Sequence, residues 1–118
     1  MSTYHQIFVR TMRTESELAA DVGVAADVQL TEDPDSPIRY AGKRPYAAVE
    51  IESSHDFLDD YGIPFEQYPI VITIRDFDRD MSRQEAFARE VFSQLADLGK
   101  YSLLLVYNLD TLLERSDA

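Results

Sequence analysis

The chain contains two histidines, His5 and His55, and no cysteine. Histidine is the side chain best suited to proton transfer near neutral pH, whereas the missing cysteines exclude thiolate nucleophiles, disulfides and cysteine-based metal sites. His55 follows Ser53 and Ser54, but neighbours in a sequence do not create the geometry of a charge relay. Neither histidine belongs to a recognisable nucleophile motif. We therefore expect no catalytic residue, and no dependence of the function on either histidine.

Three alternating acids, Asp76, Asp78 and Asp80, invite a calcium interpretation. A calcium loop of the EF-hand type needs glycine at its sixth position and glutamate at its twelfth. Those positions hold Met81 and Phe87 here. The pattern therefore predicts no metal and no cofactor, and the acids are better explained as complements to the positive end of a helix that follows them.

The length of 118 residues and a hydrophobic content of 45% predict one globular domain, residues 1–118. No apolar run approaches the roughly 18–20 residues that span a bilayer. The first residues also lack the pattern of a signal peptide. We expect a cytoplasmic protein.

Charge is the strongest compositional feature, with a net value of −11 at pH 7. This value disfavours binding to nucleic acids and to anionic membranes, and it favours basic protein partners. Two blocks without lysine or arginine, residues 14–38 and 45–74, hold seven and six of the acids. Such blocks are either solvated surface or a surface for a partner.

Hydrophobic periodicity predicts strands at 4–12, 46–53, 70–76 and 101–109. Capping boxes at Thr14–Glu17 and Ser82–Glu85 predict two helices, one ending near Gly23 and one over 83–98, and Asp110 could cap a last short helix. Residues 24–32, VAADVQLTE, could continue the first helix or turn into a short strand, and they are followed by a break at DPDSP and a connection through RYAGKRP. The fold class is α+β: the order strand, helix, strand, strand, helix, strand is typical of a ferredoxin-like split βαβ sandwich, with an antiparallel or mixed sheet and two helices on one face.

The sheet face away from the helices is expected to carry aromatic and apolar side chains, namely Phe8, Tyr46, Val71, Tyr101 and Tyr107. Exposed apolar faces usually mark interaction. This face could bury itself in a homodimer, bind another partner, or lie partly under residues 53–69.

Residues 53–69, SSHDFLDDYGIPFEQYP, mix acids with aromatic side chains. Ser53 or Ser54 could cap a one-turn helix through Asp56, with Gly62 ending it and Pro64 forcing an extended path. The segment either closes the protein's own core or binds a basic partner through aromatic anchors surrounded by acids. The partner-binding hypothesis selects Glu50, Glu52, Asp56, Phe57, Asp59, Asp60, Tyr61, Phe65 and Glu66.

Two functions from different classes are compatible with the sequence. The first is a small acidic protein-binding module, of the kind that acts as an immunity or antitoxin-like inhibitor of a basic protein. The second is a small ferredoxin-like enzyme or ligand-binding protein that acts as a homodimer, with His5, Tyr46, Tyr107 and Arg10 as its polar candidates.

Overall fold

The computed structural model describes residues 3–118, which form an α+β fold with one antiparallel sheet and two α-helices. The chain runs through β1 (His5–Arg10), α1 (Glu15–Ala26), β2 (Thr31–Glu32), β3 (Ile38–Arg44), β4 (Ala47–Glu52), β5 (Ile70–Asp76), α2 (Met81–Asp97), β6 (Ser102–Tyr107) and β7 (Thr111–Ser116). The strands lie in the order β2-β3-β4-β5-β1-β6-β7. Strand β1 is interior to the sheet, because β5 and β6 pair on its two sides.

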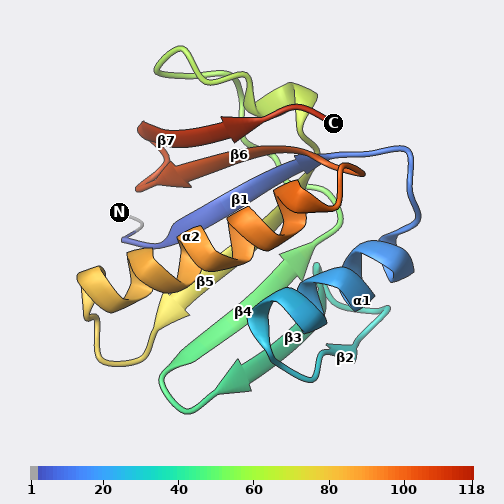
Figure 1. Ribbon diagram of the computed structural model, residues 1–118. Helices are drawn as coiled ribbons and strands as arrows, with labels where there is room; N and C mark the ends of the chain where they lie inside the picture. The colour runs from blue at the N-terminus through green and yellow to red at the C-terminus, as the bar shows by residue number, and fades with distance from the viewer. Residues whose placement is uncertain (1–2) are drawn as a thin grey trace.

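Both helices cover the same face of the sheet (Figure 1). The apolar stripe predicted for the second helix is its buried side, with Ala88, Val91, Phe92 and Leu95 in the main core. Leu98 is outside this stripe, since α2 ends before it and 46% of its surface is exposed. No helix within residues 3–118 is long and apolar enough to cross a membrane.

The two helix starts differ in how far they follow the predicted caps. Thr14 caps α1 as predicted, because its hydroxyl accepts a hydrogen bond from the Glu17 backbone N–H. Helix α2 is capped by Asp80 instead of Ser82, since the Asp80 carboxylate accepts from the Arg83 N–H. The first helix also continues past Gly23 to Ala26, and Asp27, whose backbone is left-handed, caps its C-terminal end.

Strands β3 and β7 lie where the sequence predicted none, whereas β2 lies where either a continued helix or a short strand was expected. Strand β3 falls in the expected connection, and it is held by pairing along β4. Strand β7 replaces the short helix expected after Asp110. Asn108 and Leu109 both adopt positive φ, so the chain reverses at once and pairs with β6. Side chains then alternate between the two faces of the sheet. Leu113 packs against the main core, and the neighbouring Leu112 is exposed.

The face opposite the helices carries a second apolar cluster, to which the strands contribute Phe8, Val71, Leu104 and Val106. Tyr101 and Tyr107 were predicted on this face and lie on the helix side instead, where Tyr101 joins the main core and Tyr107 stacks on His5. Tyr46 was predicted on the same face and also lies on the helix side, since its ring is 4.3 Å from the guanidinium of Arg83 on α2. The side chains of β6 therefore face the opposite sides of the sheet from those predicted, which is equivalent to a shift of one residue along the strand.

Candidate functional site

Segment 53–69 covers the second apolar cluster. Ile63, Phe65 and Tyr68 are nearly fully buried against the sheet residues of that cluster. A homodimer through this face was one expectation from the sequence. The segment now occupies that apolar surface, so the surface is not free for a second copy.

His55 holds the start of the segment in place. Its Nδ1 accepts a hydrogen bond from the Phe57 backbone N–H at 3.0 Å, so its Nε2 carries the proton and donates to the Tyr68 carbonyl at 2.6 Å. No helix forms at 53–59, where a one-turn helix was predicted. The imidazole instead satisfies the backbone groups at both ends of the loop.

The far end of the segment is a tight turn. Asp60 and Ile63 exchange two backbone hydrogen bonds around Tyr61 and Gly62, which have φ values of 50° and 72°. Two consecutive positive φ angles are typical of a type I′ turn. Asp59 and Glu66 brace it, because the carboxylate of each accepts the backbone N–H of the other. The segment is therefore an ordered excursion whose tip has a defined conformation.

Apolar side chains project from this tip. Leu58 and Tyr61 are 72% and 70% exposed, and Phe57 is 36% exposed while it also contacts Phe8 and Phe65. Of the predicted partner-binding residues, Phe65 is the exception, since it is 2% exposed and belongs to the core. Sequence alternation could not separate it from its neighbours, because the segment is not a strand at that point: Phe65 begins a single 3₁₀ turn over Phe65–Gln67. Leu58 is exposed and was not selected.

The acids of the predicted surface are exposed or half-buried. Asp56, Asp59, Asp60 and Glu66 are exposed, whereas Glu50 and Glu52 on β4 are half-buried. Burial raises the pKa of Glu52, and the nearby Glu50 carboxylate adds to this effect. Arg75, which was expected near Glu50 or Glu52, pairs across from Ala48 and lies over the Phe77 ring.

The two acidic blocks, residues 14–38 and 45–74, differ in how many of their acids form ion pairs with basic side chains. The first block is paired: Glu17 and Asp21 contact Lys100, and Glu15 and Glu32 contact Arg39. Within residues 3–118, no lysine, arginine or histidine forms an ion pair with the six acids of block 45–74. All six acids of the second block therefore lack an ion-pair partner among the described residues, whereas in the first block this holds for Asp27, Asp33 and Asp35.

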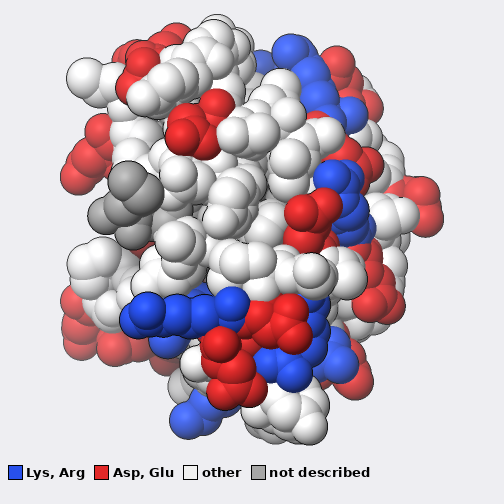
Figure 2. All heavy atoms as spheres, turned by 90° about the vertical axis from the view of Figure 1, so that its left-hand side faces the viewer, with Lys and Arg blue, Asp and Glu red and all other residues white. Residues whose placement is uncertain are grey.

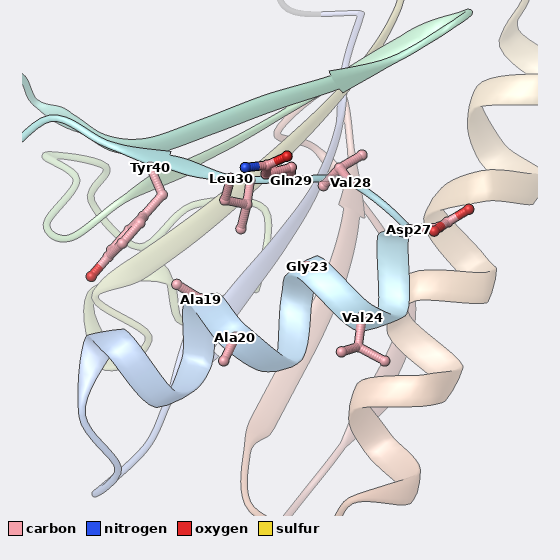
Figure 3. Close-up of a pocket in the computed structure, with 9 residues that line it drawn as sticks. All are labelled: Ala19, Ala20, Gly23, Val24, Asp27, Val28, Gln29, Leu30 and Tyr40. Carbon is pink, nitrogen blue, oxygen red and sulfur yellow. The ribbon is translucent and has the colours of Figure 1, made fainter.

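A separate hollow lies between α1 and the β2–β3 edge (Figure 3). Small residues on α1 leave room for it, and Leu30 and Tyr40 line its other side. The backbone of Gln29 passes so close to Gly42 that a Cβ there would sit 2.5 Å from the Gln29 carbonyl oxygen. Figure 3 shows the Asp27 carboxylate pointing away from the hollow. The lining is mostly apolar and brings no set of polar groups together, so we assign it no chemistry.

Asp76 is the most strongly held carboxylate on the helix side. It is 3% exposed, and it accepts hydrogen bonds from the backbone N–H groups of Asp78 and Asp80 and from the Arg83 guanidinium. Arg83 is the main reason that the pKa of Asp76 falls to about 2. The alternating acids thus form a cap and an ion pair. No group of three or more potential metal ligands occurs in the described part of the chain.

Of the four polar candidates for an enzyme site, the structure brings together His5 and Tyr107, whose ring centroids are 4.7 Å apart. Tyr46 lies beside Arg83, and Arg10 lies over the Tyr68 ring next to the other sheet face. The predicted set of four therefore does not form one site.

Comparisons of the chain with protein-family models, with curated proteins and with solved structures find no match. The function is therefore inferred from the geometry of the described residues.

Burial lowers the pKa of His5 below its ordinary value of 6.5, and Arg89 acts in the same direction against the opposing effect of Glu85. The Tyr107 ring of β6 contacts His5, and Arg89 is itself paired with Glu114 of β7. As pH falls below 6.5, His5 becomes protonated in the unfolded chain while it stays neutral in the folded protein. We expect the free energy of unfolding to decrease as pH falls below 6.5, and His5→Gln to flatten this part of the profile in urea titrations. An unchanged profile in the variant would contradict this role.

Proposed function

We propose that the protein is a small acidic protein-binding module, acting as an immunity or antitoxin-like inhibitor of a basic partner. The tip of segment 53–69 and the acids around it form the binding surface. The observation that carries this proposal is the conjunction of exposed Phe57, Leu58 and Tyr61 with six acids that lack basic partners in the described structure.

The physical roles of the two residue types differ. Uncompensated carboxylates accelerate association with a basic protein, and salt screens this effect over about 8–10 Å at physiological strength. Exposed aromatic and aliphatic side chains give the complex its lifetime, because burying them slows dissociation. The braced turn reduces the entropy lost on binding, since the tip is ordered before the partner arrives.

We also propose that the central strands and helices are an extended ferredoxin-like core. The strand order β4-β5-β1-β6 supports this proposal, with α1 following β1 and α2 linking β5 to β6. Strands β2 and β3 then extend one edge, and β7 extends the other. This fold is used for many functions, so it does not alter the functional proposal.

The charge prediction uses the triple variant Asp56→Asn, Asp59→Asn and Asp60→Asn. Asparagine keeps an oxygen that can accept the loop hydrogen bonds, so we expect the melting temperature to change little. We expect association with a basic partner captured from lysate to slow by about tenfold at low salt, and the difference to shrink at high salt. Surface plasmon resonance at two ionic strengths measures both effects.

A matched control removes three charges elsewhere. Asp27, Asp33 and Asp35 are exposed acids of the first block, and changing them to asparagine gives the same net charge. Equal slowing by both triple variants would mean that only total charge matters. Binding that is insensitive to salt and to both variants would show that the segment serves only to cover its own core.

The anchor prediction concerns Tyr61, which is exposed and contributes little to the core. Tyr61→Ala is expected to speed dissociation roughly 30-fold, as for a hot spot of about 2 kcal/mol. Stability should change by less than about 0.5 kcal/mol. Dissociation rates and thermal melts of the same sample separate the two effects, and an unchanged dissociation rate would remove Tyr61 from the interface.

A further inference from the structure

A small cavity lies at the end of the molecule where α2 begins and β6 ends. It has a volume of about 250 Å³ and is lined by His5, Met81, Ser82, Glu85, Tyr107 and Leu113. Figure 2 views this end and shows a stretch of uncharged residues at its centre, with acidic and basic side chains gathered below. The cavity is separate from segment 53–69: the cavity lies on the helix side of the sheet, and segment 53–69 packs on the opposite face.

The protonation of His5 follows from the orientation of Gln84. The Gln84 side-chain oxygen accepts from the Asp76 N–H, and its Nε2 donates to the Thr3 carbonyl, so the amide cannot be reversed without losing both bonds. The same Nε2 lies 2.7 Å from His5 Nδ1, which must therefore be an acceptor. His5 is then neutral, with its proton on Nε2.

This Nε2–H group has no hydrogen-bond partner among the described residues, although the His5 side chain is 2% exposed. Buried donors without partners are rare and costly. The Glu85 Oε1 atom is 3.8 Å away, beyond hydrogen-bond range. The Tyr107 hydroxyl donates to the Met81 sulfur at 3.8 Å, which is a weak acceptor. The cavity lining therefore contains one buried donor without an acceptor among the described residues, the His5 Nε2–H group.

The charges around the cavity restrict what that acceptor can be. Glu85 is paired with Arg89 through its other oxygen, and Arg89 also holds Glu114, so one negative charge remains uncompensated in this group. An anion is disfavoured by that charge. A cation would satisfy Glu85 but leave the His5 donor unpaired. A neutral group with a carbonyl next to an N–H satisfies both sides.

We propose that this cavity binds a small neutral ligand of the amide class. Its carbonyl oxygen accepts from His5 Nε2–H, its N–H donates to Glu85 Oε1, and its apolar part lies against Met81 and Leu113. Since the His5 Nε2 atom is itself buried, the proposal requires the unbranched Met81 side chain to rotate when the ligand enters, while Arg89 keeps Glu85 in place. Pockets for drug-sized ligands hold roughly 300–1,000 Å³, so this cavity of about 250 Å³ fits a fragment with one ring.

The test uses benzamide as the probe, with benzoate and benzylamine as an anion and a cation of similar shape. Long-range proton–nitrogen NMR spectra report both histidines, so His55 serves as an internal control. We expect benzamide to shift the His5 Nε2 signal saturably, with a dissociation constant on the order of 1 mM. Benzoate and benzylamine should bind at least tenfold more weakly, and His55 should not respond.

The matched variants are Glu85→Ala and Glu90→Ala, which each remove one carboxylate from α2; Glu90 is exposed and outside the cavity lining. Glu85→Ala should weaken benzamide binding at least tenfold, and Glu90→Ala should leave it unchanged. Circular dichroism confirms that both variants are folded. Equal binding of benzoate, a response at His55 instead of His5, or no saturable shift would each overturn the proposal. A water molecule detected at Nε2 without a benzamide response would assign the cavity to solvent and overturn it too.

Discussion

Leu95→Asp is expected to unfold the protein at 25 °C. Leu95 is 0% exposed at the centre of the core between α2 and the sheet, and none of its neighbours in that core cluster is charged. A carboxylate placed there loses its hydration without gaining a partner. The cost exceeds about 4–5 kcal/mol, against a total stability of roughly 5–15 kcal/mol for a domain. Val91→Asp should have the same effect, because Val91 is equally buried.

Gln94→Asp provides the matched control, since Gln94 is the exposed residue just before Leu95 on the same helix. We expect it to change stability by less than about 1 kcal/mol, which reflects the poorer helix propensity of aspartate and its place near the helix C-terminus. Near-UV circular dichroism and thermal melts compare the variants. A cooperative melt of Leu95→Asp close to that of the parent would mean that this stripe is not the core.

The second large effect is expected at the Asp76–Arg83 pair. Asp76→Ala removes the acceptor of two backbone N–H groups just before α2. It leaves Arg83 with the exposed Asp78 carboxylate and the Tyr46 ring as its contacts among the described residues. Truncating one member of a buried ion pair costs about 3–5 kcal/mol, and Arg83 is partly exposed, so we expect the lower end of that range. Urea unfolding at pH 7 measures the loss.

The Asp76–Arg83 pair also predicts a loss of stability at acid pH, which appears as an acid limb in a plot of the free energy of unfolding against pH. The pKa of Asp76 is about 2 in the folded protein and 3.8 ordinarily, so the folded state favours the ionised carboxylate. Its contribution to stability is complete above pH 3.8 and is lost as pH falls toward 2. Asp76→Asn should flatten this limb. Asp78→Asn is the control, because that carboxylate is mostly exposed. If Asp78→Asn flattened the acid part of the profile and Asp76→Asn did not, Asp76 would not be the group responsible.

Local signals in the sequence determined the elements that repeat a clear pattern. The strand at 70–76 matches β5 in full, and the strand at 46–53 lies within one residue of β4 at each end. The apolar stripe of α2 was also readable, because helical spacing and a buried face impose the same period. The net charge and its two blocks required nothing beyond residue counting.

Strand pairing was decided by the tertiary structure. Residues 38–44 have one buried side chain, Tyr40, and therefore no alternation to reveal β3, which exists because β4 supplies its hydrogen bonds. Residues 111–116 likewise contain two adjacent leucines that fit a helix, and they form β7 because the turn at Asn108 and Leu109 returns them to β6. Propensity in such segments is weak, so the partner strand prevails.

The candidate sites divide in the same way. Sequence alone located the acidic and aromatic segment, since its composition is unusual over 17 residues, 53–69. It could not tell which aromatic side chains face inward: Phe65 and Tyr68 enter the core while Tyr61 points out, because the turn at Tyr61–Gly62 and the 3₁₀ turn at Phe65–Gln67 set their directions. The cavity at His5 depends on residues from β1, α2, β6 and β7. Only folding brings them together, because the sheet places the first strand of the chain beside β6, nearly a hundred residues later.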